Sequence, residues 1–213
     1  MVSHEIFPEF KETLVLRKED QSLGFVHTTP DNGYPAYQGK GNYVGKLDLS
    51  NRGLLGQGAL KYLGASINTE DIVFKPEEAT GTAEKFNLEE NRNPKEQIPQ
   101  VRGEEISILW RPYKDSLYVT PKEKPFDMYK SGHHTFTGTL ILTPGGLKGN
   151  GLLDWNEASM RSKQLAFGAY SVTADTTNLG IKAFDADDLA LRTENVNADV
   201  DFDKQMGLFK AND

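Results

Sequence analysis

The sequence predicts an all-β fold built from two tandem repeats of about 93 residues each. Three observations support this prediction. Apolar and polar residues alternate with a period of two, glycine- and proline-rich turns separate the alternating runs, and the phrase GLLGQGAL at 53–60 recurs as GLKGNGLL at 146–153. Alternation of this kind is typical of strands that are buried on one face only.

The repeat extends well beyond the two phrases. A shift of 93 residues aligns 12 identical residues over the 44 positions 45–88, without a gap. The glycine pairs are Gly53 with Gly146, Gly56 with Gly149, and Gly58 with Gly151. Self-similarity at a fixed spacing indicates that one structural unit has been used twice. We therefore expect repeat 1 at 1–105, repeat 2 at 106–198 and the start of a truncated third repeat at 199–213.

Similar openings at 14–25, 108–118 and 200–209 support this division, and they suggest that the chain is a segment of a longer array. The strands expected from the alternation are 46–50, 71–75, 85–89, 105–110, 139–143 and 195–203. Turn signals stand between them at 30–33, 51–53, 130–132 and 144–146.

Each glycine phrase is expected to form the returning strand of a hairpin. Glycine inside a strand often marks a bulge or a close backbone approach. Gly56 and Gly58 are expected to clear one face of the strand, where an aromatic ring such as Tyr62 could lie; Trp155 has the same place in the second repeat. A phosphate-binding loop would need a helix directly after the glycines, and the residues that follow do not predict one.

Two architectures fit this pattern. The units could stack into an elongated β-solenoid or half-pipe with a continuous core, or each could fold alone as one of two β-sandwich domains in tandem. The stretch 88–105 is polar and contains proline, like a linker, but its counterpart 181–199 keeps alternating apolar residues. This difference favours the continuous array.

Composition restricts the functional classes. The net charge of −7 and the lack of a Lys/Arg stripe argue against a nucleic-acid partner. The chain contains no cysteine, which excludes disulfides and thiolate metal sites. It has no apolar run near the roughly 20 residues of a membrane-spanning helix, and its first residues do not resemble a signal peptide.

The sequence does not predict an enzyme or a cofactor. No Gly-x-Ser-x-Gly elbow occurs, and the four histidines lack metal-ligand spacing. The residues that the two repeats share are Gly, Leu, Ala, Ser, Thr and Phe, which build turns and cores. Asp199, Asp201 and Asp203 alternate as in calcium loops, but the central glycine and closing glutamate of such loops are missing. A solvated strand face is the favoured interpretation, and calcium binding stays open.

Aromatic residues give the only candidate ligand contacts. Trp110, Tyr113 and Trp155 could form a platform on which sugar rings stack. Aromatic residues in β proteins are more often part of the core or of cross-strand pairs, so packing is the alternative role.

Each glycine phrase is followed by an Ala-Ser pair, and a Phe stands eight residues after that Ser. In this pattern the chain resembles tandem β repeats of large envelope or surface proteins of Gram-negative bacteria. It is also similar to the amphipathic strand repeats of AsmA-like lipid-bridge proteins. The resemblance implies a periplasmic, cell-surface or secreted location and a structural or adhesive role, and it brings no catalytic residues.

Together these observations predict a non-catalytic structural or interaction module within a larger exported repeat protein of the bacterial envelope. The alternatives are a groove that conducts lipid or another hydrophobe, and a carbohydrate-binding module. The expected partners are neighbouring repeats of the same chain, together with a glycan, a lipid or another envelope protein.

Overall fold

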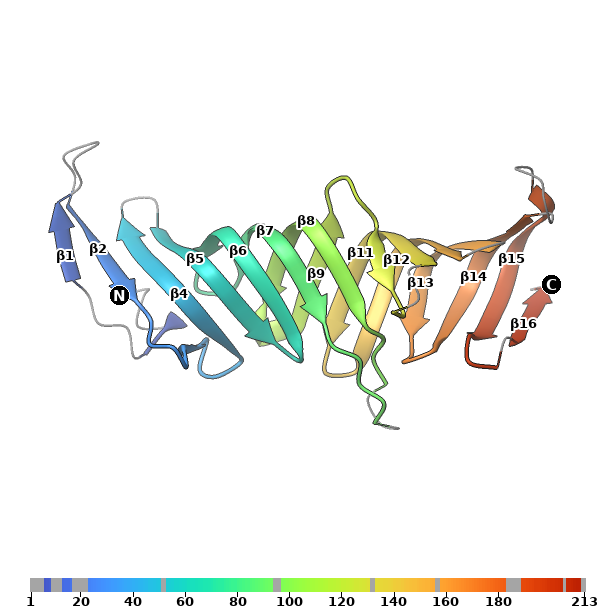
Figure 1. Cartoon of the computed structure of the whole chain (residues 1–213), viewed down its shortest axis with the longest axis horizontal. Coiled ribbons are helices and arrows are strands. Elements are labelled where there is room, and N and C mark those ends of the chain that lie inside the picture. Colours follow the sequence, from blue (N-terminus) through green and yellow to red (C-terminus); the bar gives the residue numbers. More distant parts are fainter. Residues whose placement is uncertain are drawn as a thin grey trace. The chain divides into compact units, whose positions relative to one another are not determined.

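A computed structural model describes residues 6–8, 13–16, 23–50, 53–93, 97–130, 133–155, 158–182, 189–204 and 206–211. The predicted all-β class is confirmed. The described residues form sixteen strands of one antiparallel sheet, and the order of its main path is β1-β2-β4-β5-β6-β7-β8-β10-β11-β12-β13-β14-β15-β16 (Figure 1). Strand β3 pairs with β4 beside this path, and β9 pairs with both β8 and β11.

The first strands are β1 (Thr13–Leu16), β2 (Leu23–Thr28), β3 (Tyr34–Ala36), β4 (Gly41–Ser50), β5 (Gly53–Tyr62), β6 (Ala65–Phe74), β7 (Ala79–Leu88) and β8 (Val101–Arg111). A 3-10 turn, η1 (Pro112–Lys114), precedes β9 (Ser116–Pro121). The remaining strands are β10 (Phe126–Met128), β11 (His134–Thr143), β12 (Gly146–Trp155), β13 (Ala158–Phe167), β14 (Ser171–Lys182), β15 (Leu189–Asp201) and β16 (Met206–Ala211).

The chain divides into two compact units. The first consists of Met1–Phe86 and Glu104–Tyr118, and the second of Asn87–Gly103 and Val119–Asp213. The repeat boundaries expected from the sequence, at 105/106 and 198/199, stay predictions.

Alternating burial explains why these segments form strands. In β15, Val196, Ala198 and Val200 are buried, whereas Asn197 and Asp199 are exposed. The period-two pattern seen in the sequence therefore gives the correct buried face of this strand. Strand β6 alternates in the same way on both sides of an irregular step at its centre.

The two glycine phrases form hairpins with the same bounds and register. In the β4–β5 hairpin, Gly45 stands opposite Gly58 and Leu47 opposite Gly56; the β11–β12 hairpin has the same pairs 93 residues later. The next ladder is shifted between Gly56 and Gly58 in β5–β6, and at the corresponding glycines in β12–β13. The predicted strand-turn-strand structure is confirmed, although turn residues 51–52 and 131–132 lie outside the described residues.

Gly56 and Gly58 have different roles, although the sequence analysis expects the same role for both. A Cβ at Gly56 would stand 2.7 Å from the Phe74 ring and 2.6 Å from the Tyr43 hydroxyl. A Cβ at Gly58 would instead overlap the Val44 carbonyl oxygen of the neighbouring strand. Gly56 thus leaves room for the aromatic side chains of Tyr43 and Phe74, not for Tyr62 as expected from the sequence. Gly58 lets the backbones of two neighbouring strands approach closely.

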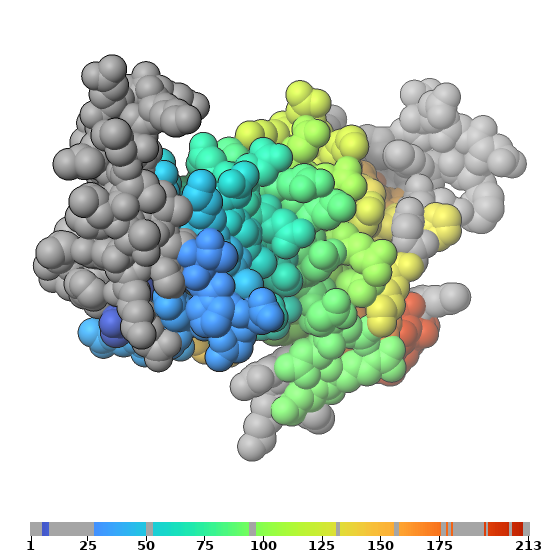
Figure 2. All heavy atoms as spheres, turned by 60° about the vertical axis from the view of Figure 1, so that its left-hand side comes forward, coloured from blue at the N-terminus to red at the C-terminus, as the bar shows by residue number. Residues whose placement is uncertain are grey.

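The second unit repeats this packing. A Cβ at Gly149 would stand 2.7 Å from the Phe167 ring and 2.9 Å from that of Phe136. Phe136 and Phe167 pack edge to face at 5.5 Å, as Tyr43 and Phe74 do at 5.2 Å in the first unit. In the first unit, the side chains of residues 28–50 (blue) lie against those of 53–86 (cyan to green) in Figure 2.

Candidate functional site: a cleft beside Tyr113

The first unit has an open cleft of about 820 Å³ between the β6–β7 turn and η1. Its lining combines one aromatic ring with prolines, an amide and charges of both signs: Pro8, Gln38, Pro76, Glu77, Glu78, Arg111, Tyr113 and Lys114. An aromatic surface with a few converging polar groups is the usual composition of a small-ligand site.

The local sequence explains why Tyr113 stands at the surface. Pro112 begins η1, where its fixed φ fits and its missing N–H costs little. Asp115 ends the turn at φ 45° with its N–H donated to the Pro112 carbonyl at 3.1 Å. Lys40 Nζ lies 2.7 Å from the Asp115 carboxylate and attaches this turn to the β3–β4 turn. Tyr113, in the middle of η1, is 52% exposed.

A column of three aromatic rings connects the cleft with the core. Tyr113 packs edge to face on Tyr37 at 6.1 Å, and Tyr37 packs edge to face on Trp110 at 5.0 Å. The Tyr37 hydroxyl donates to the carbonyl oxygens of Lys75 at 2.6 Å and Glu78 at 3.0 Å. Burial raises the pKa of Tyr37, so the hydroxyl stays a donor at neutral pH. The column therefore fixes one wall of the cleft to the β6–β7 turn.

Charged side chains complete the cleft. Arg111 Nε lies 3.5 Å from a Glu78 carboxylate oxygen, and its guanidinium stands 5.7 Å from the Tyr118 ring centre. These partners hold the guanidinium at the edge of the cleft. Arginine supplies only donors and glutamate only acceptors, while Gln38 supplies both. The arrangement suits a neutral ligand with many hydroxyl groups better than a ligand with one strong charge.

A smaller cleft of about 280 Å³ has the corresponding place in the second unit. Ala169, Tyr170 and Ser171 line it and stand 93 residues after Pro76, Glu77 and Glu78. The Tyr129 hydroxyl donates to the Ser171 carbonyl at 2.8 Å, as Tyr37 does to that of Glu78. Tyr129 also packs against Phe202 at 4.8 Å, where Tyr37 packs against Trp110.

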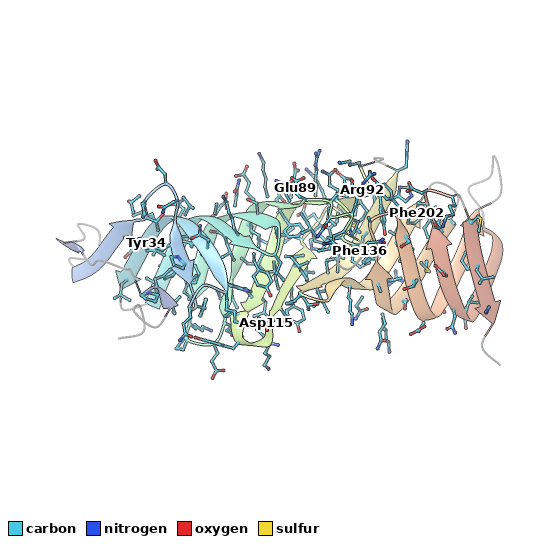
Figure 3. The ribbon with its side chains drawn as sticks, turned by 90° about the horizontal axis from the view of Figure 1, so that it is seen from below. Tyr34, Glu89, Arg92, Asp115, Phe136 and Phe202 are labelled. Atoms are coloured by element: carbon cyan, nitrogen blue, oxygen red, sulfur yellow. The ribbon has the colours of Figure 1, made fainter. Side chains whose placement is uncertain are left out.

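An arginine of the same unit lines this second cleft. The Arg92 guanidinium stands 4.6 Å from the Tyr170 ring centre and donates to the Tyr170 hydroxyl and the Glu90 carboxylate. Tyr170 donates to Glu90 at 2.7 Å, and Lys130 Nζ lies 3.2 Å from the same carboxylate. The hydrogen bond from Arg92, with the one from Lys130, lowers the pKa of Glu90, whose side chain is 8% exposed. Arg92 and Phe202, labelled in Figure 3, both contact Tyr170.

The structure separates the three predicted ligand contacts. Tyr113 lines the large cleft. Trp110 is fully buried against Tyr37 and Tyr62, so its ring offers no face to a ligand. Trp155 lies half-buried in the second unit and packs edge to face on Phe202 at 5.9 Å.

Gln38, Glu78 and Arg111 were missed by the sequence reasoning. Gln38 and Glu78 lie in two separate turns, and Arg111 is the last residue of β8. Arg111 directly follows the predicted strand 105–110, whereas Gln38 and Glu78 adjoin no predicted turn or strand.

The candidate glycines and Asp201 have structural roles in the described part of the chain. The six glycines at 53, 56, 58, 146, 149 and 151 build the hairpins, and none of them lines either cleft. Asp201 accepts hydrogen bonds from the Lys204 backbone at 3.0 Å and from its Nζ at 2.8 Å, which closes the β15–β16 turn. Within the described ranges, no three His, Cys, Asp or Glu side chains gather as metal ligands would.

No model of a protein family, no curated protein and no solved structure matches this chain. Across its described residues, the structure contains no helix with the length and apolar character needed to span a membrane. The clefts must therefore be interpreted from their own geometry.

Proposed function

We propose that this chain is a non-catalytic structural and interaction module made of two copies of one β unit. The observation that carries the proposal is the agreement of two hairpins in bounds, register and bulge position at a spacing of 93 residues. Agreement of side-chain pairing at every one of these positions would be unusual for two unrelated hairpins, because register depends on the whole apolar pattern.

Contacts far from the glycines support the same proposal. Tyr62 packs on Trp110 at 5.6 Å, and Trp155 packs on Phe202 at 5.9 Å. Each pair joins segments that are distant in sequence: Tyr62 of β5 with Trp110 of β8, and Trp155 of β12 with Phe202, which directly follows β15. A larger exported repeat protein of the bacterial envelope remains the setting that we propose, and it rests on the resemblance of the glycine phrases.

A transplant tests the two-copy proposal. Residues 41–74 would be replaced with residues 134–167, which supply the corresponding three strands. We expect a folded protein with a β circular-dichroism spectrum and one cooperative urea transition, because the apolar pattern and bulge are retained. The matched control uses residues 135–168, which shifts the register by one and turns the apolar face outward. Equal loss of folding in transplant and control would refute the proposal.

Carbohydrate binding is a second candidate, favoured by the half-exposed Tyr113 ring beside Gln38, Glu78 and Arg111. A glycan array would be probed with the protein and with Tyr113→Ala and Tyr113→Phe. We expect affinity to fall about two- to tenfold in the alanine variant, since an aromatic contact contributes roughly 0.5–1.5 kcal/mol, and to persist in the phenylalanine variant. Identical profiles for all three proteins would exclude Tyr113 as the contact.

The lipid-groove alternative finds less support. It needs an apolar face that stays open along successive strands, whereas the described interior side chains Leu47, Leu60, Leu140 and Leu153 are fully covered. The proposal therefore does not include this function.

A further inference from the structure

The first unit has another recess, of about 850 Å³, between the β3–β4 turn and the β5–β6 turn. It shares no lining residue with the cleft beside Tyr113. Lys40 and Lys61 line it together with asparagine, serine and glycine residues, and its described lining contains no Asp or Glu. The recess is therefore positively charged on a chain whose net charge is −7. It is called the lysine recess below.

Four side chains of the lysine recess form one row across strands β3, β4, β5 and β6. Pro35 of β3 stands opposite Asn42 of β4. Lys61 of β5 stands between Asn42 and Ser66 of β6. All four are exposed or partly exposed, and all four line the recess. Neighbouring strands lie about 4.8 Å apart, so the row is about 14 Å long and can contact one extended ligand.

The chemistry of the row indicates an anion that also carries hydroxyl groups. Among the described residues, no carboxylate pairs with Lys61. The Asn42 Nδ2 donates to the Asn32 carbonyl at 2.8 Å, which leaves Oδ1 as an acceptor in the place next to Lys61. An acidic sugar offers an anionic group to the ammonium and hydroxyl donors to Asn42 and Ser66, whereas a fully ionised inorganic anion has no donor for Oδ1.

The floor of the lysine recess is packed firmly against the core. Tyr62 lines the recess, is 4% exposed and packs on Trp110 at 5.6 Å. A Cβ at Gly41 would stand 2.7 Å from the Trp110 ring, so the start of β4 lies directly on the indole. A recess with a floor of this kind loses little affinity to rearrangement of the protein when a ligand binds.

One ion pair connects the lysine recess with the cleft beside Tyr113. Gln38 lines the cleft, and Lys40, two residues further along the same turn, lines the recess. Lys40 Nζ lies 2.7 Å from the carboxylate of Asp115, which directly follows Lys114 of the cleft. A chain of sugar rings can therefore cross this ion pair from one recess to the other.

We propose that the cleft and the lysine recess together bind an acidic oligosaccharide, with one ring on Tyr113 and a carboxylate or sulfate of another ring on Lys61. The inference rests on the carbohydrate candidate proposed above and names its class of sugar. The cleft suits a neutral ring with many hydroxyl groups, so the charge of the ligand lies further along the oligosaccharide, at the lysine recess.

A glycan array that carries acidic sugars beside their neutral counterparts tests the class of sugar. Uronic acids would be paired with their methyl esters, and sulfated sugars with their unsulfated forms, so the array also distinguishes carboxylate from sulfate. We expect the bound glycans to be acidic and their neutral counterparts to bind about two- to fivefold more weakly, as for the loss of one exposed ion pair. Equal binding of acidic and neutral forms would overturn this inference and leave the carbohydrate candidate in place. An array without any bound glycan would overturn both.

The variant Lys61→Gln separates the charge from the aromatic contact. In titrations of one bound acidic glycan and its neutral counterpart, Lys61→Gln should weaken only the acidic form, by about two- to fivefold. It should also reduce the loss of affinity that NaCl causes, because salt screens exposed charges. Tyr113→Ala should weaken both forms alike. Equal effects of Lys61→Gln on the two forms would overturn the assignment of the charge to Lys61.

Lys46→Gln is the matched control. Lys46 is exposed on the same face of β4 as Asn42 and lies four residues further along the strand, about 13 Å away. Its loss changes the net charge by the same amount and should leave both titrations unchanged. Equal weakening by Lys46→Gln and Lys61→Gln would show only a general attraction to positive charge and would overturn the inference.

Vesicles of phosphatidylglycerol test a membrane surface as the other source of anionic groups. We expect the protein to remain in the supernatant when the vesicles are sedimented. Co-sedimentation that Lys61→Gln abolishes would assign the lysine recess to lipid headgroups and would overturn the inference.

Discussion

Replacement of Gly58 by alanine is expected to destabilise the protein strongly. Gly58 has a φ of +156°, which side chains rarely adopt, and a Cβ there would overlap the Val44 carbonyl oxygen. The Cβ would also stand 2.7 Å from Gly45 Cα. Carbon atoms in contact are normally about 3.5–4.0 Å apart, so strands β4 and β5 would have to separate by about 1 Å.

The magnitude follows from this separation. Backbone strain at an unfavourable φ contributes about 1–3 kcal/mol. Weakening of one or two ladder hydrogen bonds adds about 1 kcal/mol each. We therefore expect the free energy of unfolding to fall by about 2–5 kcal/mol, which corresponds to a decrease in melting temperature of about 4–20 °C for a chain of this size.

The fold supplies a twin and a control for this experiment. Gly151→Ala should have a similar effect, because its Cβ would overlap the Thr137 carbonyl oxygen. At Gly53, with φ +111°, a Cβ meets nothing within 4 Å, so Gly53→Ala should show only the strain of about 1–2 kcal/mol. Urea unfolding followed by circular dichroism measures all three. The reasoning is refuted if Gly58→Ala is no worse than Gly53→Ala.

Three further predictions concern the ring columns and the Glu90 network. Tyr37→Phe and Tyr129→Phe should each lower the free energy of unfolding by about 1–2 kcal/mol in urea titrations, because each removes a buried hydroxyl that donates to a backbone carbonyl. An unchanged free energy of unfolding in both variants would show that these two hydroxyl hydrogen bonds do not hold the turns. The pKa of Glu90 is lowered from its ordinary value of 4.5. The stability that the Glu90 carboxylate contributes is therefore present above pH 4.5 and is lost as the pH falls through the lower folded pKa. Glu90→Gln should reduce this loss of stability at acid pH, as measured by urea unfolding midpoints at several pH values, and an unchanged pH profile would count against the network. Trp110→Ala should lower the free energy of unfolding in urea titrations far more than Trp155→Ala, by about 3–5 against about 1–2 kcal/mol, because Trp110 is fully buried and Trp155 only half-buried. Equal losses would contradict the assigned packing.

Local pattern predicted the strands well. The alternation in 195–203 identifies the buried residues of β15, and the glycine phrases at 53–60 and 146–153 form the expected hairpins. These features depend on neighbours along the chain, whose side-chain direction is set by strand geometry alone.

Contacts between distant segments could not be predicted in the same way. Tyr37 bonds to carbonyls some forty residues further on, and its ring covers Trp110. No local pattern distinguishes the buried Trp110 from the half-buried Trp155, and the sequence analysis therefore names both as candidate ligand contacts. Gly56 illustrates the same point, since the ring nearest to it comes from Phe74 rather than from Tyr62.

Arg92 lines one cleft, and among the described residues none has the equivalent place in the lining of the other cleft. The two clefts can therefore serve as internal references for each other. A compound added to the protein meets two similarly framed recesses at the same concentration, temperature and pH. Nuclear magnetic resonance shifts near Tyr113 that leave the signals of Tyr170 unmoved would identify selective recognition within a single sample, without a separate blank protein.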